Sequence, residues 1–141
     1  MADIMDTLRS DATLKTLVGY LEEAKLTETL KGAGPYTLFA PNNEAFVRMN
    51  IAELLKDPKT LKETLTYHLA AGKHSAKEIG AMDDLGTENG KSLTINLDEG
   101  DTVVDNAKFV TTDIECSNGL IHIIDNVFQP SLSGWYRDES G

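Results

Sequence analysis

Histidine and cysteine are the side chains of this chain whose chemistry could hold a metal ion or attack a substrate. The chain has three histidines and one cysteine, which are His68, His74, His122 and Cys116. No second cysteine or nearby carboxylate completes the ligand spacing of a zinc site around them. His68 and His122 each lie inside an apolar run, where a neutral, hydrogen-bonded core imidazole is the more frequent outcome. The sequence therefore predicts two core histidines and no metal site.

Cys116 could act as a nucleophile only beside a general base and a group that orients this base. No spacing in the sequence links it to a histidine, and a free cysteine is usually a small buried hydrophobe. The chain also lacks a Gly-x-Ser-x-Gly elbow, a phosphate-binding glycine loop and a dinucleotide fingerprint. We therefore predict no enzyme activity and no cofactor. A cytoplasmic enzyme that uses Cys116 or a histidine is the least favoured alternative.

Carboxylates are most concentrated at positions 98–101, which read Asp-Glu-Gly-Asp. An EF-hand calcium loop needs carboxylates on alternate positions, a glycine at the sixth and a glutamate at the twelfth, and this spacing fails that pattern. We expect a solvated hairpin tip instead, even with Asp83 and Asp84 as possible neighbours.

The chain is strongly acidic, with 23 acidic against 13 basic residues and a net charge of −10. Such a charge repels phosphate backbones and anionic lipid surfaces, and the lysines at positions 56–62 are interleaved with carboxylates. No apolar run approaches the roughly 20 residues that a membrane span needs. The sequence thus predicts neither a nucleic-acid partner nor membrane insertion.

The lone cysteine rules out an intramolecular disulfide, and no asparagine starts an Asn-x-Ser/Thr glycosylation site. Both absences suit a bacterial or archaeal source better than a eukaryotic secretory one. A chain of 141 residues is expected to form one domain that buries roughly 70% of its unfolded surface.

A turn, a strand and a helix start follow one another from Gly34-Pro35 onward. Residues 36–39 form a β-branched and aromatic run that fits a strand, and Asn42 is a candidate helix N-cap. This strand needs partners. The apolar run behind the hairpin signal Asn118-Gly119 is the best candidate, because it is too continuous for a strand with one solvated face.

Helices are expected mainly in the N-terminal half. One helix places Leu14, Leu17, Val18 and Leu21 on the same face, and Gly19 within it predicts close helix packing. The candidate helix starts are Asp3, Asp11 or Thr13, Thr27, Asn50 in a variant capping box with Glu53, Asp57 before Pro58, and Ser75.

Strands are expected mainly in the second half, where glycines separate short runs. In the run at 92–97, Leu93, Ile95 and Leu97 alternate with polar residues, which is typical of a strand. A hairpin is expected over 103–111 with its turn at Asp105-Asn106, and a separate strand over 113–116. These patterns predict an α+β fold.

Three of these stretches together resemble the landmarks of the fasciclin domain family. They are residues 35–46, the pair Tyr67-His68 followed by Gly72, and residues 118–130. Their order and spacing fit one complete domain, and the resemblance covers about residues 3–130.

The resemblance implies a fasciclin-like, β-rich wedge with helices packed along it. We expect this domain to span residues 1–130 and a C-terminal tail to span 131–141. Trp135 and Tyr136 are the apolar exception in this tail, as a pair that can dock on the domain or on a neighbour. The resemblance also implies export, with Met1 in place of a removed signal peptide.

In fasciclin proteins a Tyr-His pair and its flanking apolar residues are associated with cell attachment. This association maps to Tyr67 and His68 with Leu65 and Leu69. A structural role is equally open, because a tyrosine with a polar tip inside an apolar frame also makes a core clamp.

Mammalian matrix members of the family carry an Asp-Ile pair that is credited with integrin contact. The corresponding pair here is Asp113-Ile114, but its neighbours are Thr112 and Glu115. The favoured interpretation is that Ile114 packs in the core and Asp113 caps a turn.

The function implied by the resemblance is a secreted, periplasmic or cell-surface adhesion or matrix-binding module. Its expected partner is a cell-surface protein or polysaccharide. The alternative is a carrier of a small apolar, carotenoid-like ligand or of a polysaccharide, because an apolar groove is a ready pocket.

Overall fold

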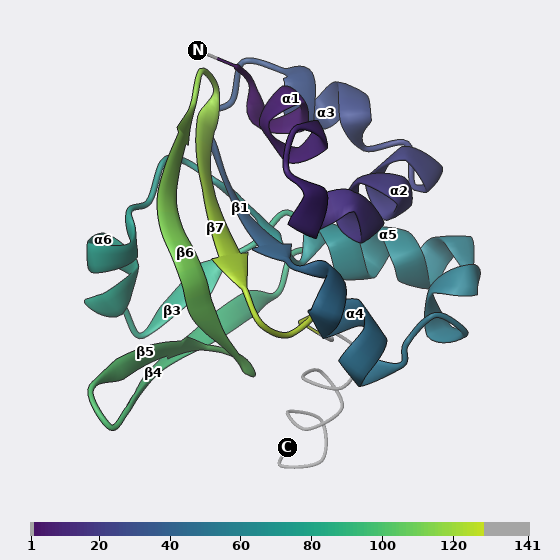
Figure 1. Cartoon of the computed structure of the whole chain (residues 1–141). Coiled ribbons are helices and arrows are strands. Elements are labelled where there is room, and N and C mark those ends of the chain that lie inside the picture. The colour runs from purple at the N-terminus through teal and green to yellow at the C-terminus, as the bar shows by residue number, and fades with distance from the viewer. Residues whose placement is uncertain (1, 129–141) are drawn as a thin grey trace.

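The structure is a computed structural model that describes residues 2–128, and all elements below lie in this range. Figure 1 shows α1 to α5 gathered on one side of the sheet. The helix α6 lies on the other side, above β3, β4 and β5 in this view. The helices are α1 (Ile4–Arg9), α2 (Lys15–Glu23), α3 (Thr27–Lys31), α4 (Asn43–Met49), α5 (Pro58–Thr66) and α6 (Ala76–Gly80), with 3-10 turns η1 (Ala12–Leu14) and η2 (Leu54–Lys56).

The strands form a seven-stranded sheet in the order β2-β1-β7-β6-β5-β4-β3. β1 and β7 are parallel, whereas all other neighbours are antiparallel. Glu88 N donates to Leu69 O at 2.8 Å, so the segment after β3 meets β2 and the sheet nearly closes into a barrel. The strands are β1 (Tyr36–Pro41), β2 (Leu69–Ala71), β3 (Asp84–Gly86), β4 (Ser92–Asp98), β5 (Asp101–Val104), β6 (Ala107–Cys116) and β7 (Gly119–Ile124).

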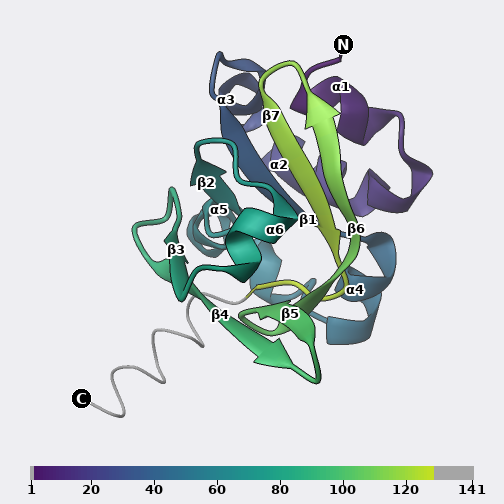
Figure 2. The ribbon, with the colours of Figure 1, turned by 90° about the vertical axis from the view of Figure 1, so that its left-hand side faces the viewer.

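The β1–β7 pair is the centre of the fold, as the sequence predicts. Every residue of β7 is buried, which is why its apolar run has no polar alternation. Side chains alternate across the pair: Leu38 and Ile121 join the core under the helices, whereas Phe39 and Ile124 join the core inside the barrel. Figure 2 views the molecule from the α6 side, where this helix lies in front of the sheet.

Asn118, in the turn between β6 and β7, ties three parts of the chain together. Its side-chain amide donates to Leu30 O at 2.7 Å and Gly32 O at 2.8 Å, and its Oδ1 accepts from Ile4 N at 3.0 Å. The next residue is Gly119, where a Cβ would overlap the backbone carbonyl of Tyr36. Only glycine permits this approach.

Most helix starts are confirmed. The side chains of Asp3, Asn42, Asp57 and Ser75 each accept a hydrogen bond from a backbone N–H of the first turn. Asp11, rather than Thr13, caps the turn η1.

Three local predictions are wrong. Gly19 does not mediate close packing, because it is exposed and no atom lies within 4 Å of the position of a Cβ. Asn50 ends α4 in a left-handed conformation instead of opening a capping box. The strand expected at 113–116 is continuous with β6.

Candidate functional site

The four residues around the Tyr-His pair are all buried. Tyr67 is 0% exposed, His68 1%, and the flanking Leu65 and Leu69 2% and 3%. None of these side chains reaches solvent in the described structure. Whether they contribute to attachment stays a prediction, and any contribution has to be made through the surface that they support.

Tyr67 follows α5 and joins it to the β4–β6 hairpins. Its hydroxyl lies 3.0 Å from Asp105 Oδ2 and 3.2 Å from Ser92 O. Its ring meets the ring of Phe128 edge to face, with centroids 6.0 Å apart. This is the geometry of a core clamp, with an apolar ring and a satisfied polar tip.

His68 is a buried neutral imidazole, as the sequence predicts. Nδ1–H donates to Thr64 O at 2.7 Å, and Nε2 accepts from Phe128 N at 3.0 Å. The ring stacks on Phe128 with centroids 4.6 Å apart. Burial lowers the pKa of His68 to about 4, and the hydrogen bond to Thr64 offsets only part of this effect.

His122 is the second buried histidine, and it carries its proton on the opposite nitrogen. Nε2–H donates to His74 O at 2.8 Å, and Nδ1 accepts from Asp113 N at 3.0 Å. The rings of Phe39 and Phe109 lie beside it, with centroids at 5.8 and 5.3 Å. Burial lowers the pKa of His122 from its ordinary value.

The loop from Gly72 to Ala76, which joins β2 to α6, is held by a buried hydroxyl on β1. Thr37 Oγ1 donates to Gly72 O at 2.7 Å and accepts from His74 N at 2.8 Å. Gly72 has a φ of +90°, a conformation that other residues rarely adopt. The loop is thereby fixed to β1 at two points.

Asp113 is the exposed member of the predicted Asp-Ile pair. It lies where the β6–β7 register shifts between Thr111 and Ile114, and its φ is +58°. Its Oδ1 accepts from Ala76 N at 3.0 Å, at the start of α6. Ile114 is half-buried and packs against the core under the helices, in line with the packing interpretation.

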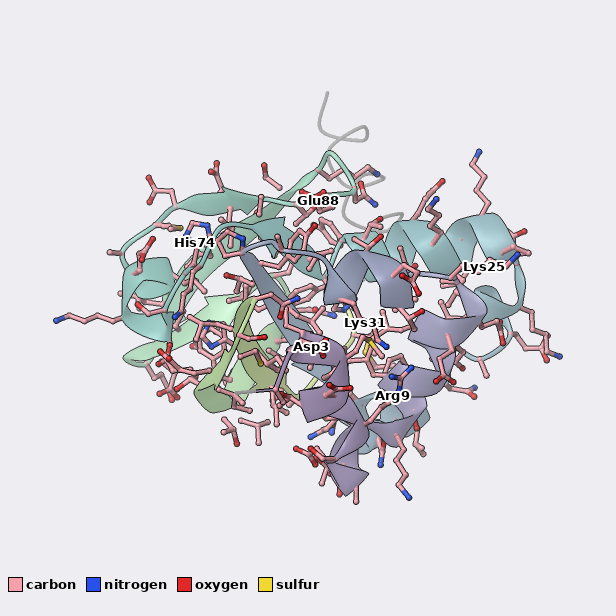
Figure 3. The ribbon with its side chains drawn as sticks, turned by 90° about the horizontal axis from the view of Figure 1, so that it is seen from above. Asp3, Arg9, Lys25, Lys31, His74 and Glu88 are labelled. Atoms are coloured by element: carbon pink, nitrogen blue, oxygen red, sulfur yellow. The ribbon has the colours of Figure 1, made fainter. Side chains whose placement is uncertain are left out.

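We refer to residues 73–76 with Asp113 and Glu115 as the Asp113 surface. Lys73 Nζ lies 3.5 Å from Glu115 Oε1. His74 contacts Glu78 Oε2 through Nδ1 at 2.9 Å, and its own side chain is 21% exposed. Figure 3 shows His74 on the side of the molecule opposite Lys25, far from the helical half.

Sequence reasoning names Asp113 as a candidate contact residue and His122 only as a core histidine, and it gives no role at this surface to Thr37 or His74. The available signal for Thr37 is a polar residue inside a fully buried strand, since a buried hydroxyl needs partners. The sequence gives no comparable signal for His74, whose backbone makes the decisive contacts.

The remaining chemical candidates of the sequence do not form a site within residues 2–128. Cys116 is buried beside Thr7, and burial raises the pKa of its thiol, which disfavours the nucleophilic thiolate. At the predicted hairpin tip, Lys108 lies 3.5 Å from Asp98 and 3.8 Å from Asp101. In this range no three His, Cys, Asp or Glu side chains are grouped so that they could hold a metal ion.

An apolar groove lies on α4, on the helical side of the fold. Asn43, Glu44, Val47 and Arg48 line it, and Val47 is 79% exposed. Arg48 anchors its own side of the groove by donating to Asn126 Oδ1 at 2.9 Å and to the backbone carbonyl of Asp125.

No helix in residues 2–128 is long and apolar enough to cross a membrane.

The fold and these contacts define an α+β module in which His68 and His122 are buried and hydrogen-bonded to backbone groups. Residues 12–130 match the model of the Fasciclin domain. The chain belongs to the fasciclin domain family, whose members are typically non-catalytic adhesion modules.

Two relatives illustrate the range of the family. The chain is 35% identical over 130 residues to an uncharacterised protein of Synechocystis sp., sll1735, covering 90% of this chain and 97% of that protein. It is 36% identical over 111 residues to the cell surface glycolipoprotein MPB83 of Mycobacterium bovis. That match covers 77% of this chain and 49% of MPB83.

A solved structure confirms the predicted fold class. The structure of a domain pair from the insect cell adhesion molecule fasciclin I matches with a TM-score of 0.74 at 20% sequence identity. The match covers 90% of this chain and 50% of that one. The predicted tail at 131–141, with Trp135 and Tyr136, lies outside the described residues.

Proposed function

We propose that this protein is an exported adhesion or matrix-binding module that acts by surface contact with a cell-surface protein or polysaccharide. Family membership supports this function, as does the description of one relative as a cell surface glycolipoprotein and of another as a cell adhesion molecule. On this proposal the module works outside the cell, in the periplasm or on the cell surface.

The observation that carries the proposal is the exposed carboxylate of Asp113, which is held in a fixed position. A flexible surface loses conformational entropy when it binds, whereas a preorganised one does not. Asp113 is fixed through its backbone N–H and through its carboxylate, and Lys73 and Glu115 lie on the same surface. A charged group held in this way is suited to recognising a partner of complementary charge.

The buried residues Leu65, Tyr67, His68 and Leu69 enter this proposal as supports. They hold α5 against the barrel, and β2, which begins at Leu69, leads directly into the loop of the Asp113 surface. Their substitution is expected to lower attachment only together with stability.

The test immobilises the purified domain and counts attached cells of its own source and of a candidate host, with soluble domain as competitor. Asp113→Asn removes the charge and keeps an oxygen that can accept from Ala76 N. Glu99→Gln is the matched control, because Glu99 is an exposed acid at positive φ in the β4–β5 turn. We expect attachment to fall with Asp113→Asn and to be unchanged with Glu99→Gln.

Absence of competitor-sensitive attachment in a folded sample would contradict the proposal. The second candidate function would then be favoured, a carrier of a small apolar, carotenoid-like ligand or of a polysaccharide. The groove beside Val47 is the observation in its favour, because a side chain 79% exposed leaves apolar surface available. Visible absorbance that copurifies with the protein, and that Val47→Asp abolishes, would support this carrier.

A further inference from the structure

His122 connects the two segments that form the Asp113 surface, which are the loop before α6 and the part of β6 around Asp113. We propose that His122 is a positioning residue that holds Asp113 and the 72–76 loop in one arrangement and uncouples Asp113 from this loop when its ring gains a proton. This inference rests on the proposed function for its biological meaning, but the geometric coupling can be tested without it.

Each ring nitrogen of His122 is used by a backbone group of a different element. Nδ1 accepts from Asp113 N in β6, and Nε2–H donates to His74 O in the loop before α6. Nine residues separate the first pair in sequence and 48 the second. The ring is therefore a direct bridge between two segments that form the same surface.

A proton on Nδ1 is incompatible with this bridge. The ring N–H would then face the Asp113 N–H, two donors whose nitrogens are 3.0 Å apart in the neutral state. The backbone N–H of Asp113 is a donor only, so it cannot accept a hydrogen bond from the protonated ring. The protonated ring must therefore lose its contact with Asp113, while Nε2–H can still donate to His74 O.

The conformation of Asp113 makes this loss consequential. A φ of +58° is sparsely populated for residues other than glycine, although aspartate tolerates it better than most. The hydrogen bond to Nδ1 holds the backbone N–H of Asp113, and a second hydrogen bond joins its carboxylate to Ala76 N. Without the first, the bulge and the start of α6 lose their common anchor.

Burial has the largest influence on the protonation of His122, and it disfavours the charged ring. The hydrogen bond to His74 O and the Asp113 carboxylate on β6 favour the protonated ring, whereas the His74 side chain on the loop opposes it. Glu78 of α6 contacts His74 in turn, and the aromatic faces of Phe39 and Phe109 carry no charge. Burial outweighs these contributions and lowers the pKa of His122, so the bridge is intact at neutral pH and opens in acid.

The main test follows wild-type protein by NMR between pH 7.5 and the onset of acid unfolding. The ring nitrogen shifts of His122 give its titration, and amide hydrogen exchange reports the opening at Asp113 and Ala76. We expect exchange at these two amides to accelerate by about tenfold beyond the intrinsic pH effect as His122 titrates, while β1 amides stay protected. If His122 titrates and neither amide changes relative to β1, the inference is wrong.

Variants separate His122 from the other titrating histidine. His122→Gln cannot titrate but can donate to His74 O, so its exchange at Ala76 should lose the acid-dependent acceleration. His68→Gln should keep that acceleration, because His68 contacts the core and not this surface. If His122→Gln is unfolded, the wild-type titration alone still decides the question. Acid-dependent acceleration that persists in folded His122→Gln would overturn the inference.

Cell attachment, measured over the same pH range, links the coupling to function. We expect wild-type attachment to fall as His122 titrates and that of His122→Gln to be independent of pH in this range. If NMR shows the coupled opening but no attachment occurs at any pH, the proposed function fails and the coupling stands. If attachment occurs but does not follow His122, the coupling has no role in binding and the inference fails.

Discussion

The surroundings of His68 and His122 show how the same side chain can serve the core in one place and the surface in another. Both rings are neutral, buried and fully hydrogen-bonded to backbone groups. His68 bonds within α5 and to Phe128, so its bonds close the barrel core. His122 bonds to two segments that are partly exposed. Burial depth therefore does not decide what a histidine does, whereas the location of its two partners does.

The largest expected effect tests the core side of this comparison. Tyr67→Ala removes a fully buried ring and its contact with Phe128, so we expect the free energy of unfolding to fall by about 4 kcal/mol. Urea unfolding measures this change. Tyr20→Ala is the control, because Tyr20 is only partly buried beside Phe46 and should lose less. An equal or larger loss for Tyr20→Ala would contradict the core role.

His68 makes the stability of the fold depend on pH. The pKa of His68 is about 4 in the folded state and near 6.5 in the unfolded state, so below pH 6.5 the unfolded chain binds the proton first. The stability that the neutral ring provides is complete above pH 6.5 and is lost by pH 4, a change of about 3 kcal/mol.

Urea unfolding of wild type and His68→Gln at several pH values measures this contribution. We expect the slope of stability against pH between 4 and 6.5 to be smaller in His68→Gln, because one titrating group is missing. Identical slopes would show that His68 is not buried as a neutral ring.

A smaller effect is expected from the hydroxyl that fixes the loop on the surface side. Thr37→Val keeps the shape of the side chain but leaves Gly72 O and His74 N without their shared partner, at a cost of about 2 kcal/mol. Attachment should fall with it, and urea unfolding and the cell assay measure the two effects. Thr94→Val is the control, because Thr94 is exposed on β4 and should change stability by less than about 0.5 kcal/mol.

The smallest effect on stability is expected at Asp113 itself. Asp113→Asn is exposed and keeps its acceptor, so the free energy of unfolding should change by less than about 0.5 kcal/mol. Cell attachment should nevertheless fall. A loss of stability comparable to that of Thr37→Val would show that Asp113 is structural and would remove the main support for the Asp113 surface.

The sequence predicts the local features of this fold well because they depend on adjacent residues. A cap such as Asp57 before Pro58 involves neighbours only, and the structure confirms it. Asn50 is the exception, since asparagine suits both an N-cap and a left-handed helix end, and only the preceding helix decides between them. The break predicted before Asp113 falls at a bulge with positive φ inside β6, where the local backbone resembles a turn.

The candidate site is harder to predict because its contacts join distant residues through the backbone. Thr37 and His74 are 37 residues apart, and His74 contributes its N–H and carbonyl rather than its ring to the contacts that matter. Every residue type except proline has both the backbone N–H and the carbonyl that His74 uses here. The Tyr-His pair is visible in the sequence, but its complete burial follows from packing that no local pattern describes.

The parallel pairing of β1 with β7 has a consequence for how the chain folds. Tyr36 pairs with Gly119 and Pro41 with Ile124, so β1 obtains this partner strand only from the far end of the domain. Closing so long a loop loses much chain entropy before any contact compensates it, and such topologies fold slowly. During synthesis the helices α1 to α5 emerge first, with their apolar faces lacking β7. The domain can therefore complete its core only after Phe128 has left the ribosome, and the apolar faces of its helices need protection from aggregation until then.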